Sequence, residues 1–115
     1  MLELELPYPP SVDHYYRRVG PRTLISRQGR HYRERVCAIL RALAIERLEG
    51  PLAMELDLYP PDRRHHDLDN TQKSLWDAMA HGGVYRDDSQ IKAFTCHMRK
   101  PMAPEGKAVV RKEAL

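Results

Sequence analysis

Cysteine and long apolar runs are both scarce in this sequence. The two cysteines, Cys37 and Cys96, stand far apart and form no C-x-x-C pair, which argues against a thiolate metal site or a redox motif. Each lies in an apolar pattern, so we expect buried thiols in a reducing compartment such as the cytoplasm. No apolar run is long enough for a membrane span or a signal peptide, so we expect no membrane partner.

The chain is also short, and one stretch of it has few acids. Its 115 residues suffice for one domain with one core, over residues 1–115, but not for an additional catalytic domain. The net charge is +3, and the stretch 17–35 holds a single acid, Glu34, among the arginines Arg17, Arg18, Arg22, Arg27, Arg30, Arg33 and Arg35. Such a run can neutralise phosphates, or it can be a well-solvated helix face.

The first half of the chain predicts a strand, a long loop and a helix. Leucines alternate with glutamates over 2–6, which is the pattern of a half-buried strand, and the prolines that follow end the strand. Residues 8–25 have the composition of a long, arginine-rich loop. Ser26 can cap a helix over 27–49, which the pair Gly50-Pro51 ends.

The second half predicts three strands and a helix. Residues 52–59 alternate as a strand, and a second helix is expected over 70–80, closed by two glycines. Residues 89–98 and 107–112 also have strand patterns. The order β-α-β-α-β-β predicts a small single domain of the α/β (α+β) class, with a mixed sheet and two helices.

Three aspartates surround the second predicted helix. Asp67 and Asp69 are two residues apart, so in an extended segment their side chains point to the same side. Asp88 follows the helix across a turn, and the spacing does not determine whether the returning chain brings it to the start of the helix. Three carboxylates around a point repel one another unless a cation neutralises them, and such hard oxygen ligands suit Mg²⁺ or Mn²⁺.

The residues of this helix also have structural interpretations. Asp69 and Gln72 form the D-x-x-Q pattern of a capping box, so Asp69 can be a plain helix cap. Lys73 lies one helical turn after Asp69, where it can form an ordinary ion pair or place a cation beside a scissile phosphate. Asp77 continues that face and is expected to be solvated, whereas Trp76 is expected in the core or at an interface.

A histidine-based metal nuclease is the rival chemical interpretation. His65, His66 and His81, together with Asn70, would supply its parts. Their local spacing fits such a site poorly, and the three aspartates would then have no role.

Several blocks of the sequence together resemble the RusA family of Holliday-junction resolvases. The blocks are PPSVDHYYR, PDRRHHDLDNTQKSLWDAM and GGVYRDDSQI, and they cover the chain from Pro9 to Ile91. Several blocks in the right order make the match much more specific than one pair of acids. One departure is Asp13, where family members tend to carry asparagine.

The resemblance implies a set of site residues. It makes Asp67, Asp69 and Asp88 both catalytic and metal-binding, and it makes Lys73 the essential lysine. Asn70 and Asp87 are associated positions with a supporting role. The side chains expected to bind DNA are Tyr15, Tyr16, Arg17, Arg18, Arg22, Arg27, Arg30, Arg63 and Arg64.

The resemblance also implies a function and partners. Family members are similar in being Mg²⁺-dependent homodimers of α/β subunits, and they are often encoded by phages or prophages. They cut four-way DNA junctions by paired nicks in opposing strands during DNA recombination and repair, without a small-molecule cofactor. A less selective nuclease of branched or flap DNA and a non-catalytic DNA-binding module are the alternatives.

Overall fold

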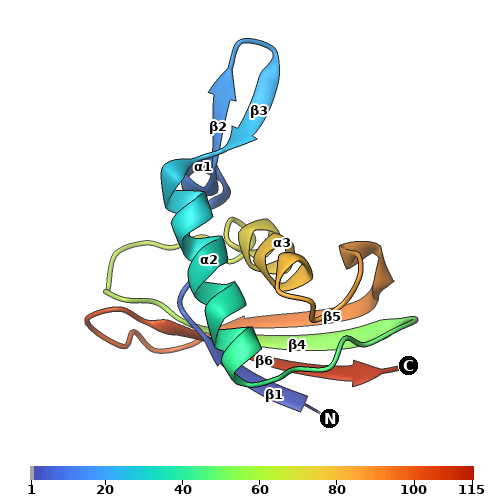
Figure 1. The fold of residues 1–115 in the computed structure, drawn as a ribbon. Coiled ribbons are helices and arrows are strands. Elements are labelled where there is room, and N and C mark those ends of the chain that lie inside the picture. The colour runs from blue at the N-terminus through green and yellow to red at the C-terminus, as the bar shows by residue number, and fades with distance from the viewer. Residues whose placement is uncertain (1) are drawn as a thin grey trace.

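Alternating apolar residues build the main sheet of the computed structural model, which describes residues 2–115. Strands β1 (Leu2–Leu6), β4 (Leu52–Tyr59), β5 (Ile91–Met98) and β6 (Lys107–Ala114) lie in the order β1-β6-β4-β5 (Figure 1). The pairs β1–β6 and β6–β4 are antiparallel and the pair β4–β5 is parallel. The mixed sheet expected from the sequence is therefore confirmed.

Two long helices cover one face of this sheet. Helix α2 (Arg27–Ala42) and helix α3 (Gln72–His81) lie side by side on it (Figure 1). Their apolar stripes and the leucine side of the sheet form one core, whose buried members include Leu4, Leu6, Tyr32, Val36, Leu40, Leu56, Leu58, Leu75 and Met79. Since a mixed sheet with helices is the architecture predicted from the sequence, the α+β fold class is confirmed.

Residues 8–25 are not a plain loop, so that prediction is wrong. They contain the short helix α1 (Val12–Tyr15) and a hairpin of β2 (Tyr16–Val19) and β3 (Arg22–Ile25), which stands away from the body of the protein (Figure 1). Gly20 has a φ of +60°, which glycine adopts without strain and which a two-residue hairpin turn needs at its first position. The predicted element order therefore lacks one short helix and one two-stranded sheet.

The bounds of both long helices differ from the predicted ones. Helix α2 stops at Ala42 instead of residue 49, because Ala44 has a φ of +52° that a right-handed helix cannot contain. Helix α3 begins at Gln72 instead of residue 70, and the short 3-10 turn η1 (Asp88–Gln90) precedes β5. Within residues 2–115, no helix has both the length and the apolarity that a bilayer span requires.

The contact between α1 and α2 leaves no room for a side chain at Gly29. Ser26 caps α2 as predicted, since its Oγ accepts a hydrogen bond from the Gly29 N–H at 2.9 Å. The Ser26 N–H in turn donates to the Tyr15 carbonyl at 2.8 Å. A Cβ at Gly29 would lie 2.2 Å from that same carbonyl oxygen. This close approach of two backbones fixes the base of the hairpin to α2.

Gly29→Ala is expected to lower the free energy of unfolding by about 1–3 kcal/mol, since overpacking outweighs the better helix propensity of alanine. Urea unfolding measures the change. The matched control is Gln28→Ala, at an exposed position of the same helical turn, which should change stability by less than about 0.5 kcal/mol. Equal midpoints for the two variants would contradict the tight contact.

Candidate active site

A hydrogen-bonded turn presents Asp88 just before β5. The Asp87 carboxylate accepts a hydrogen bond from the Ser89 N–H at 3.3 Å, and the Gln90 side-chain oxygen accepts from the Asp87 N–H at 3.0 Å. These two bonds form a capping box at the start of η1. The Gln90 side-chain nitrogen also donates to the Leu48 carbonyl at 3.1 Å, which ties the turn to the segment after α2. The backbone on both sides of Asp88 is thereby fixed.

Asp88 lies in a largely negative environment. Partial burial raises the pKa of the Asp88 carboxyl, and the neighbouring Asp87 carboxylate acts in the same direction. The Lys73 ammonium acts against them and favours the charged carboxylate. The turn before β5 therefore lies against α3, close enough for the charge of Lys73 to act on Asp88, which the sequence spacing left open.

Lys73 also lies against an aromatic side chain from the hairpin. Its Nζ is 5.8 Å from the centroid of the Tyr16 ring, within the range of a cation–π interaction. The remaining length of the side chain is exposed on α3. Lys73 is thus placed between the base of the hairpin and the Asp88 turn.

Asp69 does not cap α3, so the capping-box interpretation of this residue is wrong. Thr71 occupies the N-cap position, and its side chain makes no capping hydrogen bond. Gln72 instead turns its side chain back to the Leu68 carbonyl, at 3.2 Å. The Asp69 carboxylate is exposed, and we find no hydrogen bond to it from the described part of the chain. The helix start therefore does not need the charge of Asp69.

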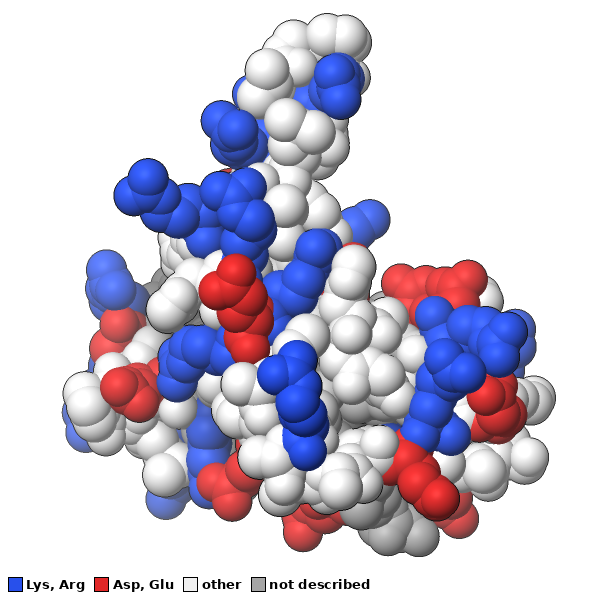
Figure 2. All heavy atoms as spheres, in the orientation of Figure 1, with Lys and Arg blue, Asp and Glu red and all other residues white. Residues whose placement is uncertain are grey.

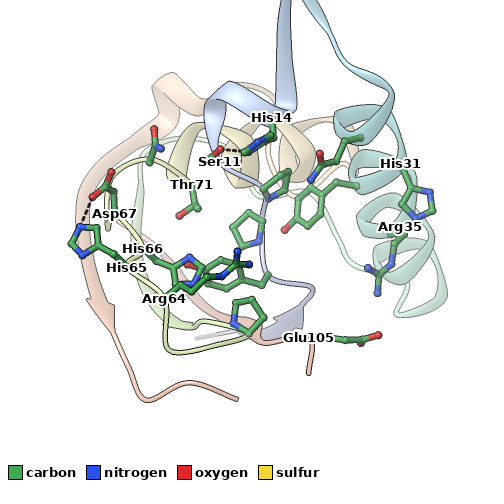
Figure 3. Close-up of a pocket in the computed structure, with 17 residues that line it drawn as sticks. Ser11, His14, His31, Arg35, Arg64, His65, His66, Asp67, Thr71 and Glu105 are labelled. Atoms are coloured by element: carbon green, nitrogen blue, oxygen red, sulfur yellow. Dashed lines mark hydrogen bonds and ion pairs between the residues drawn. The ribbon is translucent and has the colours of Figure 1, made fainter. Parts of the chain in front are cut away.

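Asp67 points toward a histidine at the edge of a large cavity. Its carboxylate lies 3.2 Å from the His65 ring nitrogen, and both side chains are largely exposed (Figure 3). The cavity has a volume of about 540 Å³ and lies between the segment 8–14, α2 and the segment 61–71. Asn70, expected to support the site, lines the same cavity. Asp67 therefore has an alternative partner, which it would have to leave to join the other two aspartates.

The segment before Asp67 is held by Asp62. Hydrogen bonds from His66 and Arg64 lower the pKa of the Asp62 carboxyl to about 2, so it is ionised at neutral pH. His66 also packs edge-on against the Tyr8 ring, with 5.7 Å between the centroids. The His66 side chain thus has a structural role, which holds the approach to the Asp67–Asp69 segment in place.

The three aspartates do not form a ready-made metal site. Among residues 2–115, no group of three or more histidine, cysteine, aspartate or glutamate side chains is placed to hold a metal ion. The donor chemistry nevertheless fits a hard divalent cation, because Asp67 and Asp69 offer exposed carboxylates and Asp88 lies in an excess of negative charge. Binding one metal ion through all three aspartates would require their side chains to rearrange.

The structure does not assemble the rival histidine site. His65, His66 and Asn70 all line the cavity of about 540 Å³. His81 lies at the other end of α3, where it lines a different cavity beside Leu40. The parts of a histidine-based nuclease are therefore separated by the length of the helix.

One predicted DNA contact is buried instead. Tyr15 has no exposed surface, and its hydroxyl donates a hydrogen bond to Asp77. Arg33 pairs with Asp77 at 2.7 Å, so Asp77 is not the solvated acid that its helix face suggested. Burial raises the pKa of the Tyr15 hydroxyl, and the hydrogen bond to Asp77 adds to the effect. These three side chains join α1, α2 and α3 beneath the hairpin, and Tyr15 cannot reach DNA in this arrangement.

The remaining basic residues are available to a nucleic acid. Lys and Arg side chains gather along the hairpin and the adjoining part of α2 (Figure 2). The predicted DNA-binding arginines are all exposed: Arg17, Arg18, Arg22, Arg27, Arg30, Arg63 and Arg64. Tyr16 is partly exposed at the base of the hairpin. A positive surface of this kind attracts phosphates and lies next to Lys73.

Sequence reasoning missed the roles of Gln90 and Asp77. Gln90 belongs to the same D-x-x-Q pattern that was recognised at Asp69–Gln72, so its capping role could have been found at Asp87–Gln90. Asp77 had no such signal, because its partners Tyr15 and Arg33 are distant in the sequence.

Comparison with known proteins agrees with the resemblance of the sequence blocks. The model of the family described as Endodeoxyribonuclease RusA matches residues 7–111. The chain is 39% identical over 89 residues to "Crossover junction endodeoxyribonuclease rusA" of Enterobacteria phage 82, covering 76% of this chain and 74% of the relative. It is 38% identical over 89 residues to the protein of that name from Escherichia coli (strain K12), with the same coverage.

A third relative extends the match over nearly the whole chain. "Crossover junction endodeoxyribonuclease RusA" of Escherichia coli O139:H28 (strain E24377A / ETEC) is 33% identical over 105 residues, covering 90% of this chain and 87% of the relative. Nucleases of this family act on DNA and are in general metal-dependent. The family match and the relatives thus show that the chain belongs to the RusA family of endodeoxyribonucleases.

Proposed function

We propose that this protein resolves four-way DNA junctions, as a Mg²⁺-dependent homodimer that makes paired nicks in opposing strands. The observation that carries the proposal is that the charge of Lys73, which lies against Tyr16 of the basic hairpin, acts on Asp88, in a chain whose relatives are named crossover junction endodeoxyribonucleases. Mn²⁺ is expected to substitute for Mg²⁺, since both prefer carboxylate oxygen. The relative from Enterobacteria phage 82 also supports a phage or prophage origin.

The residues divide the chemistry between them. Asp67, Asp69 and Asp88 would hold the metal, which when bound stabilises negative charge on the phosphate and activates water for attack. Lys73 adds a fixed positive charge beside the scissile phosphate, where charge develops in the transition state. Asp87 and Gln90 keep the Asp88 turn in shape. The exposed arginines bind the flanking phosphates and set the position of the junction.

The dimer follows from the number of cuts. Each chain carries one set of the three aspartates, whereas resolution needs two nicks. A two-fold symmetric dimer supplies two sites that match the pseudo-two-fold symmetry of a four-way junction. Light scattering at assay concentrations should give twice the mass of one chain, and a persistent monomer would contradict this part of the proposal.

Cleavage of matched substrates tests the activity. Synthetic four-way junctions, duplexes and flaps of the same sequence are incubated with and without Mg²⁺, and products are separated on a denaturing gel. We expect junctions alone to be cut efficiently, and only with the metal. Equal cleavage of all three would favour the less selective nuclease, and binding without cleavage would favour the non-catalytic module.

Mg²⁺ should stabilise the wild-type protein in proportion to its binding. A ligand at ten times its Kd stabilises the folded state by about 1.4 kcal/mol, which raises the melting temperature. Asp88→Asn should abolish the rise, whereas Glu113→Gln, at an exposed position on β6, should retain it. Thermal unfolding of the three proteins in EDTA and in Mg²⁺ gives six melting temperatures, and the same rise in Asp88→Asn would exclude Asp88 as a ligand.

A further inference from the structure

A second cavity separates the hairpin from α3. It has a volume of about 570 Å³, and its wall includes Tyr16, Arg18 and Thr23 of the hairpin, Lys73 of α3 and Asp13 of α1. It lies on the Lys73 side of the molecule, and it shares none of its lining with the cavity that Asp67 borders. Pockets of this size accept a small ligand or a part of a larger one.

The two faces of the hairpin are not equivalent. Residues directly opposite each other in an antiparallel pair point to the same face, and neighbours along a strand alternate. The pairs Tyr16–Ile25 and Arg18–Thr23 therefore share one face, and the pair Val19–Arg22 lies on the other. Tyr16, Arg18 and Thr23 all line the cavity, and Arg17 of the other face lines it too, whereas Arg22 does not. Most of the hairpin's contribution to the cavity wall thus comes from one face.

The Tyr16 ring is held firmly enough to place Lys73. It packs edge-on against Tyr15, with 4.8 Å between the ring centroids, and Tyr15 is buried and bonded to Asp77. Lys73 Nζ lies 5.8 Å from the Tyr16 centroid. The aromatic ring therefore keeps the ammonium at the mouth of the cavity instead of leaving it free to move in solvent.

We infer that this cavity holds the DNA strand that is cut, with Arg18 as a ligand to a phosphate next to the scissile one and Tyr16 as a positioning residue for Lys73. The inference rests on the proposed function and deepens it. A phosphodiester strand suits the cavity, because two guanidinium groups, a hydroxyl and an ammonium line it: those of Arg17, Arg18, Thr23 and Lys73.

Substitution of Asp13 should change DNA affinity in the opposite direction to substitution of Arg18. Its exposed carboxylate lines the same cavity, so it repels a bound phosphate. Removing this charge should strengthen DNA binding, whereas removing Arg18 should weaken it. Misfolding would weaken binding in both variants, and so it cannot produce this pair of results.

The experiment compares Arg18→Ala, Asp13→Asn and Lys100→Ala on one four-way junction. Lys100 is the control, since it is an exposed cation that follows β5 and is not among the predicted DNA-binding residues. Junction binding is measured in EDTA at several salt concentrations, and single-turnover cleavage is measured in Mg²⁺ with enzyme at saturation. The Tyr16 variants Tyr16→Phe and Tyr16→Leu are measured in the same way.

Arg18→Ala should make the plot of log binding constant against log salt concentration less steep by about 0.9, because one phosphate contact is lost. It should also lower the saturated cleavage rate about tenfold or more, because the strand is misplaced. Lys100→Ala should leave that rate within about twofold, and Asp13→Asn should bind more tightly. Tyr16→Phe should cleave as the wild type does, while Tyr16→Leu should lose about as much rate as Lys73→Ala, with binding retained. A wild-type cleavage rate in Tyr16→Phe would show that the aromatic ring of Tyr16, and not its hydroxyl, places Lys73.

Equal saturated rates for Arg18→Ala and Lys100→Ala, or unchanged binding by Asp13→Asn, would overturn the inference. In that case the wild type still cuts junctions, and the proposed function stands. If the wild type itself cuts no junction, the proposed function fails first, and the inference fails with it.

Discussion

Replacing Asp67, Asp69 or Asp88 by asparagine is expected to reduce junction nicking by about a hundredfold or more in each case. Each substitution keeps the shape of the side chain and removes one negatively charged ligand of the metal. The metal supplies several kcal/mol of transition-state stabilisation, and about 1.4 kcal/mol corresponds to a tenfold change in rate. Single-turnover cleavage of a four-way junction measures the loss.

The same variants should keep their fold and their affinity for DNA. Metal-free junction binding should hold or strengthen, because a negative charge near the phosphates has been removed. Asp69 is the most informative position, since its carboxylate does not cap α3 and even Asp69→Ala should therefore unfold at the wild-type midpoint. Glu34→Gln, an exposed acid on α2, is the control that should retain full activity.

One result would contradict the metal-site hypothesis directly. If Asp69→Asn folds normally and nicks junctions at the wild-type rate, the carboxylate is not a ligand. The fold and the basic hairpin would then support DNA binding alone, or a site built from other residues.

Lys73→Ala is expected to lower the cleavage rate by about 10²–10³-fold. In other enzymes, a loss of this size follows the removal of one hydrogen-bond donor that stabilises negative charge in the transition state. Binding should change little, because Lys73 is one of 19 lysines and arginines. Lys73→Arg keeps the charge but replaces a compact ammonium with a planar fork, so it should recover only part of the rate.

The control for Lys73 is Lys92→Ala, at an exposed position of β5, which should cleave as the wild type does. Cleavage rate and metal-free Kd are measured on the same junction for all three variants. Equal losses of binding and rate in Lys73→Ala would reassign this residue to DNA docking.

The sequence predicted the sheet and the long helices because their signals are local. Alternating leucines over 2–6 and 52–59 place one side of each strand in the core, and the predicted burial is confirmed at Leu4 and Leu56. The hairpin in 8–25 was missed because most of its side chains are exposed, three arginines among them. Without a buried face it shows no apolar alternation, and Gly20-Pro21 is as common in loops as in hairpin turns.

The acids show where local patterns fail. The D-x-x-Q pattern occurs twice, and it forms a capping box at Asp87–Gln90 but not at Asp69–Gln72. Asp87 has the extended backbone that a cap needs, whereas Thr71 takes the N-cap position of α3 with a near-helical backbone. The choice between the two depends on how the chain enters each helix, which tertiary packing sets. The approach of Asp88 to Lys73 depends on that packing too.

Cleavage of a supercoiled plasmid that extrudes a cruciform tests the central claim most directly. A dimer that nicks both strands within one binding event converts the plasmid to linear DNA, whereas independent nicks give open circles. We predict linear product with Mg²⁺, none in EDTA, and none from a matched plasmid without the cruciform. Open circles as the lasting product, or equal cleavage of both plasmids, would contradict resolution by paired nicks.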